Sequence, residues 1–320
     1  RLPLPRRALA AAWERGAGPA PRDADVVHAP TLLVPPRRRR PLVVTVHDTV
    51  PWTHPDTLTP HGARWHRAMG RRVARYADAV LVPTHAVAED LRIYLGVGTD
   101  RLHVVGEGVS PAVATAPPDA DERAARLGLP PGGYLLTLAT FEPRKGLDVA
   151  LAALADPAAP PLPLLVVGQP GWGGVDPAAQ AARLGLPAGR VRVLGRLSDA
   201  DLAVVLARAR LLLVPSRSEG FGLPLLEAFT HGVPAVVSAV PALVEVGGDA
   251  VLHVPVGDPV ALATTARTVV EDPALHDWLS AAARRRAAAF GWDATAEVCW
   301  SLYRALAGAP ATSAGPIGPA

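Results

Sequence analysis

Residues 211–227 have the sequence LLLVPSRSEGFGLPLLE. An apolar run ends at Pro215, a short polar loop follows, and a second apolar stretch begins with a proline near its start. The first run is continuous rather than alternating, which is typical of a parallel strand buried on both faces. Proline suits the first turn of a helix, so we predict a helix from about Leu223. A strand followed directly by a helix is the repeating unit of doubly wound α/β sheets.

The same pattern recurs along most of the chain. Short runs rich in valine and leucine alternate with longer helical stretches, which implies parallel sheets with right-handed crossovers. The predicted strands are 42–46, 79–83, 102–105, 134–139, 164–168, 191–194, 211–215, 235–237 and 251–253. The first half holds only about four of the roughly six strands of a complete nucleotide-binding-type domain. We therefore expect its first strand–helix units to be absent.

The length of 320 residues indicates two domains rather than one. Residues 110–119 (SPAVATAPPD) are rich in proline and alanine and lack periodicity, which is typical of a linker. We therefore predict a first, incomplete Rossmann-like domain over 1–112, a second over 113–290, a closing helix over 291–307 and a disordered tail over 308–320.

The composition is that of a globular protein, with 49% apolar residues and no apolar run of the roughly 18 to 20 residues that span a bilayer. The single cysteine, Cys299, excludes an intramolecular disulfide and a cysteine-rich metal site, and together with the lack of an export signal it favours the cytoplasm. The sequence has 31 Arg against a single Lys, which resembles the coding bias of a GC-rich genome, so the arginine content is weak evidence of function. We expect no nucleic-acid partner.

Charge is distributed unevenly between the two halves. Residues 1–118 hold 16 Arg against 10 acidic residues, a balance of +6, whereas residues 119–320 hold 16 basic against 19 acidic residues, a balance of −3. The first half is therefore the better candidate for facing an anionic surface.

The loop and helix start within residues 216–227 suit the binding of a phosphate. The backbone N–H groups of Gly222 and Leu223 would lie at the positive end of a helix dipole, at the carboxyl edge of a parallel sheet. Glu219 precedes the helix and Glu227 lies one turn below Leu223, so two carboxylates can flank the phosphate and accept hydrogen bonds from sugar hydroxyls. The alternative is a glycine turn followed by a surface helix, but the combined spacing favours the binding site.

Two further motifs carry chemistry. Residues 141–146 (FEPRKG) follow the first strand of the second domain and place Arg144 and Lys145 where the next helix should begin. A basic pair is unfavourable at that end of a helix, so binding of a diphosphate explains it better than a solvated helix start. Residues 43–48 (VVTVHD) form a strand that ends at His47, at the edge of the sheet where ligands bind. Alone, such a histidine would more often be structural.

These motifs resemble those of glycosyltransferase family 4. Residues 216–227 are similar to the E-x7-E element of the family, with Glu219 and Glu227 at its ends, and residues 141–146 are similar to its E-P-R-K-G/N motif. The resemblance covers roughly residues 26–306 and is strongest in the second half. It implies that the closing helix over 291–307 crosses back onto the first domain. It implies the GT-B fold, in which two Rossmann-like domains face each other across a cleft, and retaining, metal-independent transfer from a nucleotide sugar.

The resemblance also implies roles for the candidate residues. On the second domain, the donor would be held by the carboxylates of Glu219 (sugar) and Glu227 (ribose), the side chains of Arg144 and Lys145 (phosphates), and the backbone amides of Phe221, Gly222 and Leu223. On the first domain, His47 would approach the transferring sugar. We predict His47 and Glu219 as the catalytic residues, and we expect neither a protein nucleophile nor a metal or other cofactor.

The predicted function is transfer of a hexose from a nucleotide-diphosphate sugar to a glycan or lipid-linked acceptor held on the first domain. Mannose from GDP-mannose is our guess for the donor. The basic run at 37–40 suggests peripheral contact of the first domain with an anionic membrane, against the alternative of a solvated loop. Two other functions stay open: a GT-B sugar-nucleotide epimerase, and a truncated protein that binds nucleotide without turnover.

Overall fold

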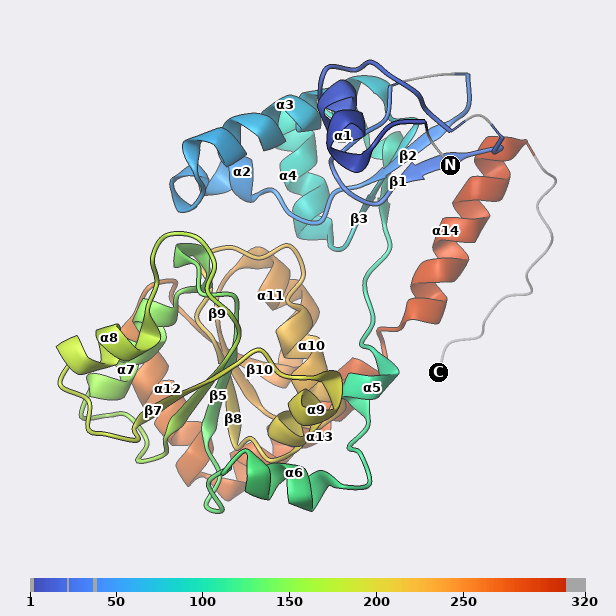
Figure 1. Ribbon diagram of the computed structural model, residues 1–320. Coiled ribbons are helices and arrows are strands. Elements are labelled where there is room, and N and C mark those ends of the chain that lie inside the picture. Colours follow the sequence, from blue (N-terminus) through green and yellow to red (C-terminus); the bar gives the residue numbers. More distant parts are fainter. Residues whose placement is uncertain (1–2, 22, 37–38, 309–320) are drawn as a thin grey trace.

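The computed structural model describes residues 3–21, 23–36 and 39–308, which form two α/β units (Figure 1). The first unit contains α1 (Arg6–Glu14), β1 (Val27–Ala29), β2 (Leu42–Thr45), α2 (Val50–Thr53), η1 (Pro55–Thr57), α3 (Pro60–Tyr76), β3 (Ala79–Val82), α4 (His85–Leu95), η2 (Thr99–Arg101) and β4 (Leu102–Val104). Residues 309–320 of the predicted tail, and Arg37 and Arg38 of the basic run, lie outside the described residues.

The second unit continues the alternation of strands and helices. It contains α5 (Pro111–Ala114), α6 (Ala120–Arg126), β5 (Leu135–Leu138), η3 (Pro143–Lys145), α7 (Leu147–Ala155), β6 (Leu164–Val167), α8 (Pro177–Arg183), β7 (Val191–Gly195), α9 (Asp199–Ala207), β8 (Leu211–Val214), α10 (Leu223–Thr230), β9 (Ala235–Ser238), α11 (Pro241–Gly247), η4 (Gly248–Ala250), β10 (Val251–Val254), α12 (Pro259–Glu271) and α13 (Pro273–Ala287). The helix α14 (Trp292–Ala307) follows it. Each predicted strand is present, with both ends within one residue of the prediction.

The two parallel sheets differ in strand order. The first has the order β1-β2-β3-β4, and the second has the order β10-β9-β8-β5-β6-β7. The second order is that of a doubly wound sheet, in which the winding reverses between β5 and β8. Ligands bind at such a switch point, because the loops after its two strands diverge to opposite faces.

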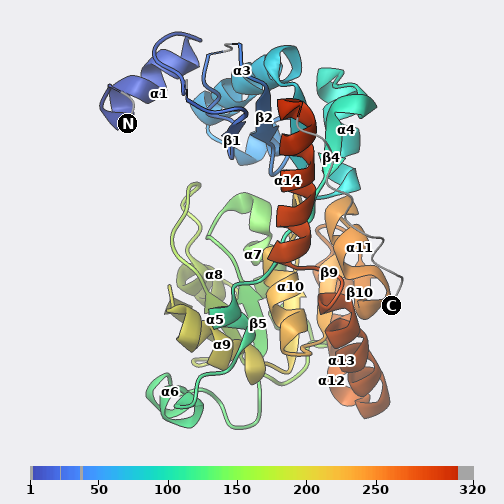
Figure 2. The same cartoon turned by 90° about the vertical axis from the view of Figure 1, so that its right-hand side faces the viewer.

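The first sheet is covered on one face by its own helices and on the other by the end of the chain. Val80 packs on one face in a cluster with Val73 of α3 and Leu91 of α4. Leu81 points to the opposite face, because side chains alternate along a strand, and it packs there against Leu302 of α14. The last helix thus returns to the first unit, as Figure 2 shows.

The four inner strands of the second sheet, β9, β8, β5 and β6, are buried on both faces, which explains their continuous apolar runs. Leu136 and Leu212 pack with Leu225 of α10 on one face. Leu135 and Leu211 belong to a second cluster with helices α7 and α12 on the other. Full burial of a leucine side chain contributes roughly 1.5 to 3 kcal/mol, so these strands fix the platform on which the loops at their ends are held.

Two segments differ from the sequence prediction. The predicted linker 110–119 contains the helix α5, whose Val113 is buried in the core of the second unit. Pro111 can begin that helix because the first helical position needs no N–H donor. The helix α1 was not predicted, and none of its residues is buried. The predicted division of the chain into domains stays a prediction. Among the described helices, none is long and apolar enough to cross a membrane.

Candidate active site

Two of the predicted motifs meet at the switch point of the second sheet. Residues 141–146 follow β5, residues 215–222 follow β8, and the two strands are hydrogen-bonded neighbours. The backbone N–H of Arg217 donates to the carbonyl oxygen of Arg144 at 2.8 Å. The two loops are therefore held together by main-chain contact.

The basic pair lies on a 3₁₀ turn rather than at the start of the next α-helix. Arg144 and Lys145 belong to η3, and Gly146 with φ of 63° separates them from α7. A Cβ atom at Gly146 would lie 2.0 Å from the carbonyl oxygen of Pro215, so only glycine allows this approach of the two loops. The prediction that Arg144 and Lys145 begin the next α-helix is therefore wrong, because Gly146 separates them from α7. Both side chains instead reach the loop after β8.

Glu219 is the acceptor for both cations. Its carboxylate is bound by Lys145 Nζ at 2.7 and 2.9 Å, by Arg144 Nη1 at 3.1 Å and by the hydroxyl of Ser216 at 2.7 Å. Its side chain is only 7% exposed. Burial alone would raise the pKa of Glu219, but the charges of Lys145 and Arg144 and the two hydrogen bonds outweigh it and hold the pKa below its ordinary value. Glu219 is thus an anion in the ligand-free site.

The start of α10 offers unused backbone donors. Gly222 is the N-cap residue, and within the described part of the chain the amides of Phe221, Gly222 and Leu223 have no hydrogen-bond acceptor. These amides can bind an anion at the positive end of the helix. The side chain of Phe221 does not take part, since it is buried with its ring edge-on to Phe290, 5.5 Å between centroids.

Glu227 occupies a different environment from Glu219. It lies on α10, and burial, with a smaller contribution from the charge of Asp199, raises its pKa to about 7. Among the described residues, no group donates a hydrogen bond to its carboxyl group, so it is available to ligand hydroxyls. Asp199 is the first residue of α9, whose N-cap Ser198 accepts from the amide of Asp201. The influence of Asp199 on Glu227 was not predicted from the sequence.

His47 follows β2 of the first unit. Its Nδ1 lies 3.4 Å from Oε1 of Glu107, and its Nε2 lies 3.0 Å from the carbonyl oxygen of Pro30. The pKa of His47 is raised above its ordinary value, mainly by the hydrogen bond with Glu107. Burial lowers the pKa, whereas the hydrogen bond with Pro30 and the charges of Glu107 and Asp48 raise it further. Asp48 accepts from the amide of Val50, as expected for a turn residue. Glu107 could not be identified from the sequence, because it lies after β4 in a segment without periodicity.

The loop after β8 touches the first unit directly. A Cβ atom at Gly220 would lie 1.8 Å from the carbonyl oxygen of His47, so the two backbones are in contact there. The hydroxyl of Thr84, the N-cap of α4, donates to the carbonyl oxygen of Gly220 at 2.9 Å. His47 therefore lies beside the loop that carries Glu219 and the free amides, and the structure brings together the predicted residues of both units.

A second contact joins α11 to α4. The carboxylate of Glu245 accepts from the amide of His85 at 2.8 Å, from Nδ1 of the same residue at 2.9 Å and from the amide of Ala86 at 3.0 Å. A carboxylate at a helix N-terminus satisfies free amides and complements the helix dipole. The helix α4 is thus capped from the other unit.

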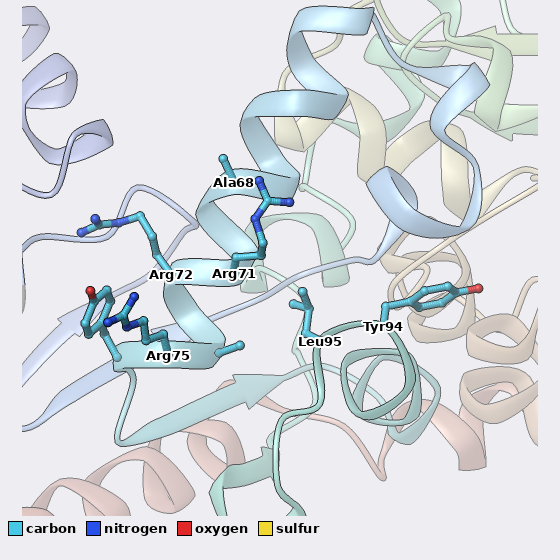
Figure 3. Close-up of a pocket in the computed structure, with 8 residues that line it drawn as sticks. Ala68, Arg71, Arg72, Arg75, Tyr94 and Leu95 are labelled. Carbon is cyan, nitrogen blue, oxygen red and sulfur yellow. The ribbon is translucent and has the colours of Figure 1, made fainter.

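A hollow of about 680 Å³ lies elsewhere, between the last turns of α3 and α4. Arg71, Arg72, Arg75 and Tyr94 are among the residues that line it. Figure 3 shows that Arg71 and Arg72 point in different directions and that Tyr94 points away from both. Because these side chains do not converge, the hollow is not a second candidate for the reaction site.

Two family profiles match the chain. The profile of the glycosyl transferases group 1 matches residues 120–286, and that of Glycosyltransferase Family 4 matches residues 1–113. The chain belongs to the group 1 glycosyl transferases. The resemblance deduced from the E-x7-E and E-P-R-K-G motifs is thereby confirmed.

Two relatives with different names are similar to this chain. O-antigen chain mannosyltransferase B of Escherichia coli is 30% identical over 88% of this chain and 74% of its own length. A D-inositol 3-phosphate glycosyltransferase of Nocardioides sp. is 34% identical over 82% of this chain and 62% of its own length. The chain therefore matches only part of each relative.

Solved structures show the same fold. Sucrose-phosphate synthase from Thermosynechococcus elongatus superimposes with a TM-score of 0.75 at 24% identity, covering 96% of this chain and 82% of its own. HepE from Anabaena, in complex with UDP and glucose, superimposes with a TM-score of 0.69 at 24% identity, covering 82% of this chain and 72% of its own. The group 1 glycosyl transferase described here has the GT-B fold, as predicted. The roles of its site residues stay predictions.

Proposed function

We propose that the chain is a retaining glycosyltransferase that moves a hexose from a nucleotide-diphosphate sugar to a glycan or lipid-linked acceptor without a metal ion. The observation that supports this most directly is the arrangement at the switch point of the second sheet. Two cations and a set of unused amides lie there beside His47 of the other unit. Such a site matches the charge of a diphosphate with protein groups alone.

The proposed reaction breaks the bond between the anomeric carbon of the sugar and the oxygen of the diphosphate. The acceptor hydroxyl oxygen forms the new bond to that carbon on the same face, and its proton passes to the leaving diphosphate. Arg144, Lys145 and the amides before α10 stabilise the negative charge that grows on the leaving group. His47 and Glu219 act on the sugar by charge and position, so no covalent intermediate with the protein is required.

The donor and acceptor identities are proposals of their own. GDP-mannose is our first choice of donor, and the name of the Escherichia coli relative supports mannose. The Anabaena structure holds UDP and glucose, and the Nocardioides relative is named for D-inositol 3-phosphate, so UDP-sugars and a phosphate-bearing acceptor belong in the same test.

A panel of nucleotide sugars, incubated with and without candidate acceptors, tests the proposed function. The expected result is release of nucleoside diphosphate that depends on the acceptor, with a product in which the anomeric configuration of the donor is kept. An isomerised sugar formed from the donor alone would indicate an epimerase instead. Binding of the nucleotide sugar without any turnover would indicate a nucleotide-binding protein.

We also propose that the first unit contacts an anionic membrane, which would present a lipid-linked acceptor. The excess positive charge of residues 1–118 supports this, and each basic residue near such a surface contributes on the order of 1 kcal/mol. Within the basic run, Arg39 and Arg40 are exposed. Co-sedimentation with anionic vesicles at low salt should fall when residues 37–40 are changed to serine. Serine at Arg71, Arg72 and Arg75 removes a similar charge elsewhere on the unit, and equal losses in the two variants would exclude a specific role of the loop.

A further inference from the structure

The imidazole of His47 faces a hydrogen-bond acceptor with each of its nitrogens. Nε2 lies 3.0 Å from the carbonyl oxygen of Pro30, and Nδ1 lies 3.4 Å from a carboxylate oxygen of Glu107. A carbonyl oxygen and a carboxylate oxygen both accept hydrogen bonds and cannot donate them. The ring can satisfy both only when each nitrogen carries a proton, which makes it the imidazolium cation.

The charged and titratable groups around His47 come from four parts of the fold. Glu107, on the segment after β4, has a side chain that is 13% exposed, and Asp48 is next in the chain. His28 of β1 is bonded to the hydroxyls of Thr45 and Tyr303, the latter from α14. Burial, together with the positive charge on His47, lowers the pKa of His28. The charges that act on His47 are those of Glu107 and Asp48, and both are negative.

We propose that Glu107 is a positioning residue for His47, holding it as a doubly protonated cation beside the donor loop. The alternative is a purely structural contact that ties the segment after β4 to the first sheet. If Glu107 positions His47, loss of its carboxylate should change the charge and protonation of the imidazole ring. If the contact is only structural, the same loss should change only the stability of the protein.

The consequence for the reaction rests on the proposed function. An imidazolium has no free lone pair on nitrogen, so His47 cannot accept the proton of the acceptor hydroxyl, and that proton must go to the leaving phosphate. The carbonyl oxygen of His47 contacts Gly220, and Gly220 lies in the chain between Glu219 and the free amides. His47 is therefore beside the donor loop. The half-exposed ring can instead offer its positive charge to the anionic donor substrate.

Proton NMR titration of the histidine rings in the ligand-free protein tests the pairing without relying on turnover. His47→Gln assigns the resonance of His47, and Glu107→Gln removes the negative charge with little change in shape. We expect the titration midpoint of His47 to lie above that of an ordinary histidine and to fall by about one pH unit or more in Glu107→Gln, the effect of losing one bonded opposite charge. An unchanged midpoint would overturn the proposal.

Two further variants separate charge from structure. Glu245→Gln is the matched control, because Glu245 bonds Nδ1 of His85 at 2.9 Å, and it should leave the midpoint of His47 in place. Glu107→Asp keeps the charge and should retain much of the raised midpoint. If the Asp and Gln variants lower the midpoint equally, charge is not the cause and the proposal fails.

The pH dependence of donor turnover then tests the role of the cation. Because the raised pKa keeps His47 charged to higher pH, the alkaline loss of activity should move to lower pH in Glu107→Gln and stay in place in Glu245→Gln. A profile that does not move while the NMR midpoint does would refute the role of the cation in the reaction. If no nucleotide sugar is turned over at all, the proposed function fails, and the NMR titration still decides the pairing.

Discussion

The carboxylate of Glu219 is held in the ligand-free site by the two cations that we assign to the donor phosphates. A bound diphosphate would attract the same cations, so Lys145 and Arg144 must be shared between Glu219 and the ligand. With its side chain only 7% exposed, Glu219 also balances their charge when no ligand is present. Its loss should therefore affect stability as well as turnover, which the sequence motif alone does not indicate.

Glu219→Gln should remove turnover and lower the free energy of unfolding by about 3 to 5 kcal/mol, because it leaves the partly buried Lys145 without its anion and leaves Arg144 with only the longer pair to Glu142, at 3.8 Å. Added nucleoside diphosphate should restore part of this stability, since its phosphates replace the lost charge. Thermal unfolding with and without ligand measures both effects. Asp148→Asn is the control, because it breaks the more exposed pair with Arg217 and should cost less than about 1 kcal/mol. Equal losses in the two variants would contradict the assigned role.

Glu227 should couple nucleotide binding to pH. Its pKa is raised to about 7, so in the free protein the carboxyl group is largely protonated at pH 6 and ionised at pH 8. Ribose hydroxyls bond more strongly to the ionised form, so nucleotide affinity should increase as the pH rises through 7. Below pH 7, binding should release the proton of Glu227. Calorimetric titration in two buffers of different ionisation enthalpy measures that proton. Glu227→Gln should abolish the release, and a release unchanged in this variant would rule out Glu227 as its source.

Much of the site was predictable at the scale of single residues. Glu219, Glu227, Arg144 and Lys145 were identified because strand ends, helix starts and charge are visible in the sequence. The ion pair between Glu219 and Lys145 was not predicted, although the neighbouring positions of β5 and β8 in a doubly wound sheet imply it. Glu107 could not be predicted, because its meeting with His47 depends on the path of the chain between the two units.

At the scale of elements, the loop after β8 meets β2 through one glycine. Gly220→Ala would place a methyl carbon against the carbonyl oxygen of His47 and should push the two units apart. We expect nucleoside diphosphate affinity to stay within a few-fold, because the second unit holds those contacts alone. Turnover should fall by roughly a hundredfold, the effect of misplacing reacting groups by about 1 Å.

A steady-state assay beside a binding titration checks this prediction. Gly132→Ala is the matched control, because a Cβ atom there meets nothing within 4 Å and the residue precedes β5, away from the first unit. Turnover of Gly220→Ala equal to that of the control would show that the contact between the loop and β2 is irrelevant to the reaction.

The elements themselves differ in how well the sequence predicted them. The strands of both sheets were predictable because continuous apolar runs are required where both faces are buried. The helix α5 was missed because a run rich in proline and alanine is typical of a linker, and only its packing of Val113 into the second core makes it a helix. Tertiary contact rather than local preference decides such short segments.

At the scale of the whole molecule, the closed arrangement of the two units rests on few contacts. Thr84 donates to Gly220, Glu245 caps α4, and α14 packs on the first sheet. The return of the last helix to the first unit was expected from the family resemblance, and α14 packs there. The contacts of Thr84 and Glu245 could not be predicted from the sequence, because each joins residues far apart in the chain with no pattern of their own. Together they place the acceptor-side unit against the loops that we assign to the donor.

The most direct test of the central claim is calorimetric titration of nucleoside diphosphate and of the matching nucleoside, in excess EDTA, with the wild type, Arg144→Ala and Lys145→Ala. Each variant should lose roughly ten- to a hundredfold in affinity for the diphosphate, about 1.5 to 3 kcal/mol for a charged hydrogen bond, and keep its affinity for the nucleoside. Wild-type affinity for the diphosphate in both variants, or binding that requires added magnesium or manganese, would contradict a metal-independent donor site at the switch point of the second sheet.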